Sequence, residues 1–349
     1  MFTAPLGGRY AVQSELASGG SGRIYLAEDL RLGRPVVVKI VATSLQASLD
    51  EAVRRLEREA RVAGGIHHPN VCAVSDFGKL DDGRPFLVME HLTGESLATR
   101  LGRERSLPIA VAMDFAYQML GGLDAAHRRG VIHRDIKPEN LFLIEIGLGR
   151  HLLKVLDFGT AQVLDTSSPY GDELTDTDRV MGTMAYMSPE QLKGVRDFDA
   201  RTDVYSAAVV IYEMLVGTRP FGDVPSDRLA EAIAFTRAPS ILHRLPNLAH
   251  PVARAIDTAL SVDRTRRPAD AAAFLAMLAA PPSPTSIVDR SVPEADPLQI
   301  ISDWDLPTHQ NRAQDDWDLV TLERDRRALV ASNEDVLSID VKIDREPLR

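Results

Sequence analysis

Three side chains within one short stretch have the types and spacing of a phosphoryl-transfer site. In Val131–Asn140, Lys137 lies two residues after Asp135 and Asn140 lies five residues after it. A carboxylate can accept the proton of a hydroxyl group, a lysine can offset charge on phosphoryl oxygens, and an amide oxygen can ligate a hard cation such as Mg²⁺. The alternative is a polar surface loop that has the same residue types by chance, and the rest of the sequence distinguishes between the two.

A glycine cluster and a lysine in an apolar strand precede this stretch. Gly19, Gly20 and Gly22 follow an expected strand at 10–16 and precede another at 23–27. Backbone N–H groups of such a loop can approach phosphates closely because no Cβ intervenes, although a plain glycine-rich hairpin has the same pattern. A strand rather than a helix follows the glycines, which disfavours a dinucleotide-binding motif.

Lys39 lies within the apolar strand 36–41, so we expect it to need an anionic partner. Glu59 is the candidate, because it lies on a stretch at 49–64 whose apolar residues recur at helical spacing. The pattern therefore predicts an ion pair between a strand and a helix of the same small lobe.

The remaining periodicities predict a small sheet followed by helices. Two further strands are expected at 70–77 and 84–89, which completes a five-stranded sheet with one helix. A hairpin formed by 140–144 and 151–156 is expected to end at Asp157. Helices are expected at 108–129, 203–215, 227–237, 251–261 and 269–280.

Composition favours a soluble cytoplasmic protein that binds neither a membrane nor nucleic acid. The most apolar window, 204–216, contains Glu213 and is too short and too polar to cross a bilayer, and no N-terminal signal peptide is expected. The single cysteine, Cys72, cannot form an intramolecular disulfide and indicates a reducing compartment. Of the net charge of −10, residues 281–349 carry −7, with 15 acidic against 8 basic side chains. The charge gives no sign of a nucleic-acid surface.

Together these residues resemble the eukaryotic-like (Hanks-type) bacterial serine/threonine protein kinases. The resemblance covers residues 10–278 and rests on the glycine cluster, Lys39, His133-Arg134-Asp135 with Asn140, Asp157-Phe158-Gly159 and Ser188-Pro189-Glu190, in family order. It implies an α+β, bilobal protein-kinase fold in residues 1–280. The N-lobe, about 10–90, has a five-stranded antiparallel sheet plus one helix, and the C-lobe, about 91–280, is mainly helical.

The resemblance also implies roles for individual residues. Asp135 accepts or orients the substrate hydroxyl, Lys137 neutralises the transferring phosphoryl group, and Asn140 and Asp157 hold Mg²⁺. Lys39, paired with Glu59, holds the phosphates of ATP. The implied nucleotide-binding residues are Ala17, Gly19, Gly20, Gly22, Ile24, Lys39, Met89, Glu90 and Leu92. Ala17 stands where the family usually has its first glycine, so we expect at most a weaker nucleotide affinity.

Further matches imply structure and regulation. Glu190 is expected to pair with Arg267, and Asp203 to cap its buried helix and bind the backbone of the catalytic loop. Thr183 precedes the substrate-docking floor and, with the residues after Lys137, favours serine or threonine as acceptor. Arg134 before the catalytic aspartate indicates activation by phosphate on a nearby loop. The expected autophosphorylation sites are Thr175 and Thr177.

The C-terminal region 281–349 reads as a proline-rich linker and an acidic tail that we expect to be disordered. It contains two related segments, Ser302–Leu306 and Asp315–Leu319, each with one tryptophan. Such a segment can dock a partner protein or its own kinase domain, and both alternatives stay open.

The sequence predicts a cytoplasmic signalling kinase that transfers the γ-phosphoryl group of ATP to Ser or Thr of protein substrates. The alternative is a pseudokinase scaffold, which usually lacks the counterpart of Lys39, Asp135 or Asp157; all three are present here.

Overall fold

The structure is a computed structural model that describes residues 4–19, 22–41, 64–158, 182–195 and 197–279. A boundary between residues 288 and 289 divides the chain into two units, and only the first contains described residues. Within these ranges, no helix combines the length and the apolar character that a membrane crossing requires.

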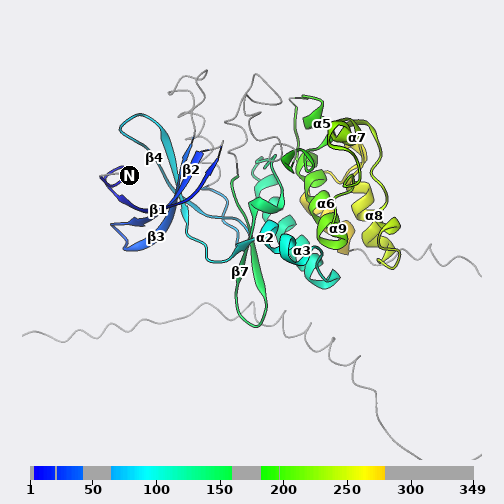
Figure 1. The fold of residues 1–349 in the computed structure, drawn as a ribbon, viewed down its shortest axis with the longest axis horizontal. Coiled ribbons are helices and arrows are strands. Elements are labelled where there is room, and N and C mark those ends of the chain that lie inside the picture. The colour runs from blue at the N-terminus through cyan, green and yellow to red at the C-terminus, as the bar shows by residue number, and fades with distance from the viewer. Residues whose placement is uncertain (1–3, 20–21, 42–63, 159–181, 196, 280–349) are drawn as a thin grey trace, which may run out of the picture. The chain divides into compact units, whose positions relative to one another are not determined.

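The N-terminal lobe contains a five-stranded antiparallel sheet, as the sequence predicts. The strands follow one another in the order β1-β2-β3-β5-β4, so the last hairpin folds back beside β3. Figure 1 shows these strands in blue and light blue. Their bounds are β1 Tyr10–Gly19, β2 Gly22–Asp29, β3 Arg34–Val41, β4 Val74–Lys79 and β5 Pro85–Glu90.

One face of this sheet packs in a hydrophobic cluster, and the other carries Lys39. Val36, Val38 and Ile40 of β3 are buried in a hydrophobic cluster on one face. Because side chains alternate along a strand, Lys39 lies on the other face, directly opposite Ile24 of β2. The alternation explains how an apolar strand carries a lysine without placing it in the core.

The predicted strand 70–77 starts later than expected, since β4 begins at Val74. The residues before it pair with the C-terminal lobe instead: Cys72 N donates to Val155 O (2.9 Å) and Val155 N donates to Asn70 O (2.8 Å). An apolar run suits a strand in either sheet, so the pattern alone could not reveal this change of partner.

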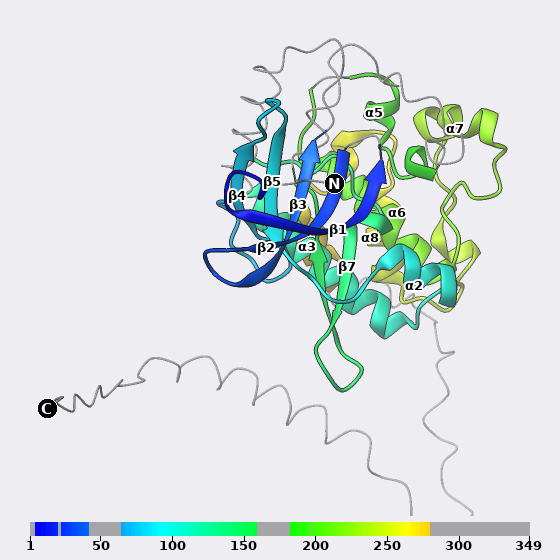
Figure 2. The ribbon, with the colours of Figure 1, turned by 60° about the vertical axis from the view of Figure 1, so that its left-hand side comes forward.

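The C-terminal lobe is mainly helical, as predicted (Figure 2). A three-stranded sheet in the order β6-β7-β8 accompanies the helices. Its strands are β6 Glu95–Ser96, β7 Leu141–Glu145 and β8 His151–Val155. The α-helices are α2 Leu97–Glu104, α3 Ile109–His127, α5 Pro189–Leu192, α6 Arg201–Val216, α7 Leu229–Phe235, α8 His250–Ala259 and α9 Ala271–Ala279. The 3₁₀ turns are η1 Pro138–Asn140, η3 Ser226–Arg228, η4 Ile241–His243 and η5 Arg264–Arg266.

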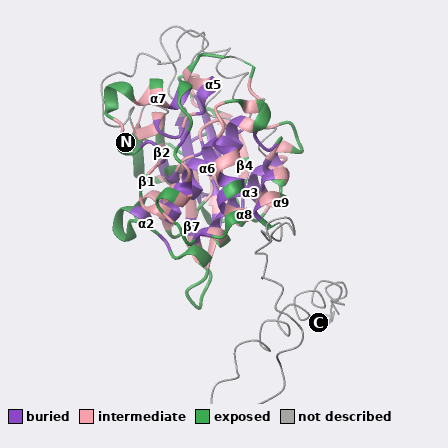
Figure 3. Ribbon diagram, turned by 90° about the vertical axis from the view of Figure 1, so that its right-hand side faces the viewer, coloured by how far each residue is buried: buried purple, intermediate pink, exposed green. Residues whose placement is uncertain are grey.

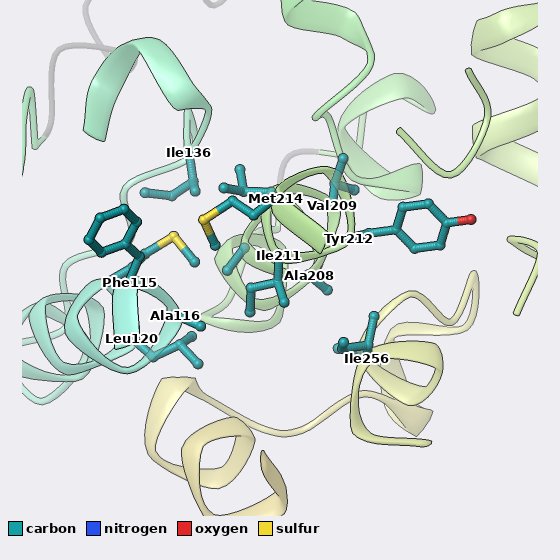
Figure 4. Close-up of a cluster of buried hydrophobic side chains, with 14 of the residues drawn as sticks. Phe115, Ala116, Leu120, Ile136, Ala208, Val209, Ile211, Tyr212, Met214 and Ile256 are labelled. Carbon is teal, nitrogen blue, oxygen red and sulfur yellow. The ribbon is translucent and has the colours of Figure 1, made fainter. Parts of the chain in front are cut away.

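Helix α6 lies at the centre of this lobe. It is apolar nearly all round, and Figure 3 shows it as a continuous buried segment. Figure 4 shows Ile211 and Met214 of α6 between Phe115 of α3 and Ile256 of α8. The helix ends at Gly217, whose φ of 82° is a conformation that glycine adopts without steric cost. A helix buried in this way is a rigid support for the loop that precedes η1.

Candidate active site

Asp203, in the first turn of α6, holds the backbone of the catalytic loop. Its carboxylate is fully buried and accepts hydrogen bonds from His133 N (2.7 Å), Arg134 N (2.7 Å) and His127 Nε2 (2.9 Å). Burial alone would raise its pKa, but the hydrogen bond from His127 and the electrostatic attraction of the two histidines lower the pKa overall. The carboxylate is therefore held ionised beneath the loop.

The predicted capping role of Asp203 is wrong. The residue at the N-cap position of α6 is Ala200, and the N–H of Arg201, the first helical residue, donates to Asp199 Oδ1 (2.9 Å) rather than to Asp203. The acceptor oxygens of Asp203 are already used by the N–H groups of the neighbouring loop, and these pairings outweigh a local cap.

Asp135 is the centre of a polar cluster at the surface of the loop. Its Oδ2 lies 2.9 Å from Lys137 Nζ and accepts a hydrogen bond from Asn140 Nδ2 (3.0 Å). Asn140 Nδ2 also donates to the backbone oxygen of Asp135 (2.7 Å), and Lys137 Nζ donates to Thr183 Oγ1 (3.3 Å). With 33% of its side chain exposed, the Asp135 carboxylate is both oriented and accessible.

Lys39 and Asp157 form an ion pair that connects the two lobes. Lys39 Nζ donates to Asp157 Oδ2 at 2.9 Å, and the lysine side chain is only 2% exposed. A buried ammonium needs such an anionic partner. Asp157 has a φ of 56°, an unusual conformation for a residue with a side chain. The predicted pairing of Lys39 with Glu59 involves a residue outside the described ranges.

Backbone contacts fasten Asp157 to the catalytic loop. Leu156 N donates to Asn140 O (2.9 Å), and His133 Nε2 lies 2.7 Å from Leu156 O. The ring of Phe158 packs edge-on against the ring of His133 at 4.8 Å between centroids. The residue that binds Lys39 and the loop that carries Asp135 therefore form one connected site.

Several residues predicted to contact a nucleotide lie on one face of the first sheet. Ala17 is opposite Ile24, Ile24 is opposite Lys39, and Gly19 is opposite Gly22 at the turn between β1 and β2. Met89 lies on the same face as Lys39, because it pairs with Val37, two residues before the lysine. Gly20 and the expected phosphorylation sites Thr175 and Thr177 lie outside the described residues.

The segment that connects the lobes is fastened at Glu90. Its backbone N donates to Ala73 O (3.0 Å), and its Oε1 accepts from Ala73 N (2.7 Å) and Lys154 Nζ (2.7 Å). Leu92 follows two residues later and is partly exposed. These contacts join the end of β5 to the start of β4 and to β8.

Glu190 and Arg267 form a buried ion pair, as the resemblance to the kinase family implies. Arg267 donates from Nη1 and Nη2 to the two carboxylate oxygens of Glu190, each at 2.8 Å. Burial would raise the pKa of Glu190, but the guanidinium group lowers it overall. The pair ties α5 to the segment before α9.

A pocket of about 490 Å³ lies beside the catalytic loop. It contains two carboxylates, Glu139 and Glu213, and Tyr186 donates its hydroxyl proton to Glu213 Oε2 (2.6 Å). Burial raises the pKa of Glu213 above its usual value, although the hydrogen bond from Tyr186 opposes this. The lining residues are Ala98, Leu101, Gly102, Arg105, Pro138, Glu139, Tyr186, Glu213 and Gly217. The sequence pattern does not predict this pocket, and the one signal that it offers is Glu213, an acidic residue within an apolar helix.

The residues fit a magnesium ion that is completed by phosphate oxygens. No group of three or more His, Cys, Asp or Glu side chains suited to a metal occurs within the described ranges. Mg²⁺ that accompanies a nucleotide needs only one or two protein oxygens, however. Asn140 and Asp157 supply such oxygen donors from backbone segments that are hydrogen-bonded to each other.

Comparison with known proteins decides the family. A sequence model described as "Protein kinase domain" matches residues 10–278. The chain belongs to the protein kinase family. It is 36% identical over 274 residues to the serine/threonine-protein kinase pkn3 of Myxococcus xanthus, covering 78% of this chain and 50% of that relative. It is 37% identical over 270 residues to the serine/threonine-protein kinase PknL of Mycobacterium tuberculosis, covering 77% and 63%.

This protein kinase spans between half and two thirds of the length of those relatives. Its fold is similar to the crystal structure of the Mycobacterium tuberculosis PknI kinase domain, with a TM-score of 0.59 and 24% identity over 77% of this chain and 94% of that chain. At this identity the likeness concerns the fold alone.

Proposed function

We propose that this protein kinase transfers the γ-phosphoryl group of ATP to Ser or Thr hydroxyls of protein substrates. The observation that carries the proposal is the connection of two polar clusters: the Lys39–Asp157 ion pair and the cluster of Asp135, Lys137 and Asn140. Each cluster supplies one half of the chemistry. The hydrogen bonds of Leu156 with the Asn140 backbone and with the His133 side chain join the two clusters.

The first half is nucleotide binding. Lys39 would bind phosphate oxygens of ATP. Ala17, Ile24 and Met89, on the same face of the first sheet as the lysine, would cover the nucleotide. Asn140 and Asp157 would hold Mg²⁺, which supplies charge neutralisation at the phosphates when bound. Lys39 is held by Asp157 before nucleotide arrives, so little ordering remains to be done.

The second half is the acceptor hydroxyl. Its oxygen would form a bond to the γ-phosphorus while the bond from phosphorus to the bridging oxygen of ADP breaks, and its proton would pass to the Asp135 carboxylate. Asn140 and Lys137 fix that carboxylate, and Lys137 also offsets charge on the phosphoryl group in transit. Thr183, in contact with Lys137, would line the acceptor position.

Several observations support a protein substrate with a Ser or Thr acceptor. Both compared relatives are named serine/threonine-protein kinases. The pocket with Glu139 and Glu213 opens directly beside the catalytic loop, where side chains flanking the acceptor residue would lie. A cytoplasmic signalling role and activation by phosphorylation of Thr175 or Thr177 complete the proposal.

The competing function is a scaffold that binds nucleotide and partners without transferring phosphate. The presence of Lys39, Asp135 and Asp157, with Lys39 paired to Asp157, favours the enzyme. Residues 281–349 either dock onto a partner protein or dock onto the kinase domain of the same chain. Deletion of 281–349 would raise kinase activity only if the tail docks onto its own kinase domain.

Incubation with labelled ATP and a generic basic protein tests the enzyme against the scaffold. We expect wild type to phosphorylate Ser or Thr and Asp135→Asn to lose at least about a hundredfold in rate, since the carboxylate positions and accepts the proton. Asp227→Asn, which changes an exposed carboxylate on η3, is the matched control and should keep full activity. Wild type no more active than Asp135→Asn would refute the proposed transfer.

A further inference from the structure

Gln191 of α5 connects that helix to the backbone of the catalytic loop. Its Nε2 donates to Arg134 O (2.8 Å), while its Oε1 accepts from Ser188 N (2.9 Å) and Ser188 Oγ (3.1 Å). A backbone N–H can only donate and a carbonyl can only accept, so these partners define one orientation of the amide. Both ends of the side chain are therefore engaged.

The carbonyl that Gln191 binds belongs to the peptide unit immediately before the Asp135 side chain. At the other end of this unit, Asp135 N donates to His133 Nδ1 (3.2 Å). The orientation of a peptide plane sets ψ of the residue before it and φ of the residue after it. Gln191 and His133 together therefore fix the direction in which Asp135 leaves the backbone.

Arg134 adds a reason why this peptide unit needs external support. Its φ is 68°, in the left-handed region that residues with a Cβ rarely occupy. Such a conformation persists only where surrounding contacts enforce it. Asp203 Oδ1 holds the N–H of Arg134 (2.7 Å), and Gln191 holds its carbonyl, so both polar groups of the strained residue are tied.

We propose that Gln191 is a positioning residue for phosphoryl transfer: its amide holds the peptide unit between Arg134 and Asp135 so that the Asp135 carboxylate points at the acceptor hydroxyl. The inference rests on the proposed function, because Gln191 acts through Asp135. Rotation of that peptide unit would also break the bonds from Asn140 to the backbone and carboxylate of Asp135.

A role confined to the helix end is the competing explanation, because Ser188 and Gln191 also form a capping box at the start of α5. The two roles use different atoms of the same side chain. The cap needs the oxygen of Gln191 as acceptor, whereas the proposed positioning needs its nitrogen as donor. Substitutions that keep either the acceptor or the donor at position 191, and remove the other, therefore distinguish capping from positioning.

Three variants make this separation. Gln191→Glu keeps the acceptor that a capping box prefers and places a carboxylate against the Arg134 carbonyl. Gln191→Lys keeps a donor for that carbonyl and removes the acceptor. Ser188→Ala removes the hydroxyl half of the capping box and leaves the Ser188 N–H bond and the bond from Gln191 to the Arg134 carbonyl intact, so it is the control for a weakened cap alone.

Steady-state kinetics with ATP and a basic protein substrate, together with thermal melting, test the inference, with Asp135→Asn as background. For Gln191→Glu we expect kcat to fall between about tenfold and about a hundredfold, because a small misplacement of a reacting group has effects of this size. KM for ATP and the melting temperature should stay at the wild-type values. Gln191→Lys should lower the melting temperature and keep kcat within about threefold. Ser188→Ala should lower the melting temperature slightly, because it removes the capping hydroxyl, and keep kcat at the wild-type value.

Two results would overturn the inference and leave the kinase function standing. One is an unchanged kcat in Gln191→Glu, with wild type well above the Asp135→Asn background. The other is a parallel loss of kcat and melting temperature in the Glu and Lys variants, which is the signature of a cap alone. Wild type at the background level would instead remove the proposed function and the inference with it.

Discussion

Two buried carboxylates of the C-terminal lobe have similar surroundings and different tasks. Asp203 lies under the catalytic loop and binds backbone N–H groups, whereas Glu190 lies in α5 and binds the guanidinium group of Arg267. In both, burial opposes ionisation and the hydrogen-bond partners outweigh it, so both pKa values are lowered. The hydrogen-bond partner therefore decides the role of each carboxylate. Glu190, paired with a guanidinium group, holds two segments together, whereas Asp203, paired with backbone N–H groups, fixes the conformation of a loop.

The largest expected loss of stability follows from breaking the pair at Glu190. Arg267→Met would leave a buried carboxylate without its cation, which costs roughly 3–5 kcal/mol of unfolding free energy. We expect the molecules that stay folded at low temperature to keep kcat near wild type. Urea unfolding and kinetics at low temperature measure both quantities, and Glu190→Gln combined with Arg267→Met should recover part of the stability. A loss of kcat without a loss of stability would contradict the distinction between the two carboxylates.

Substitution of Asp203 should lower kcat strongly and reduce stability less than the loss of Arg267 does. Asp203→Asn keeps one acceptor oxygen and presents an amide N–H₂ to N–H donors, which costs roughly 1–3 kcal/mol. Because those donors belong to His133 and Arg134, we expect kcat to fall more than about tenfold while KM for ATP changes little. The same kinetics and urea unfolding check this. Full activity in Asp203→Asn would show that the loop keeps its shape without this anchor.

A third carboxylate, in the first sheet, gives a smaller effect that depends on pH. Asp29 accepts hydrogen bonds from Arg9 Nε (2.9 Å) and Nη2 (2.7 Å), and the guanidinium group lowers its pKa to about 2. Because the folded-state pKa is below that of the unfolded chain, the contribution is complete above about pH 4 and is lost as the pH falls towards the folded value.

Thermal melting of wild type and Asp29→Asn between neutral pH and pH 2.5 measures this contribution. The difference in melting temperature between the two should be constant near neutral pH and shrink below about pH 4. Measuring the difference removes the acid response that Asp203 and Glu190 contribute to both proteins. A difference that stays constant down to the lowest pH would contradict the role of the ion pair with Arg9.

The sequence predicts the fold and the residue types of the site because both depend on local patterns. The five strands and the buried helix α6 follow from the pattern of apolar residues, and the pairing of Glu190 with Arg267 follows from the family resemblance. The partners of side chains are harder to predict. Gln191 lies 57 residues from the carbonyl that it binds, and neither residue signals the other in the sequence. The separation of 118 residues between Lys39 and Asp157 poses the same problem.

The pairing of residues 70–73 with β8 decides which parts can move together. Cys72 and Asn70 are bonded to Val155, and Glu90 is bonded to Ala73 and Lys154, so the residues before β4 and the end of β5 are both anchored to the same short strand, β8. A rocking motion of the first sheet would have its axis there. Displacement grows with distance from an axis, so the tip between β1 and β2, at Gly19 and Gly22, would swing widely while the backbone at Glu90 stays nearly still. Such a motion would open the first sheet at the tip between β1 and β2 and leave the contacts of Glu90 in place.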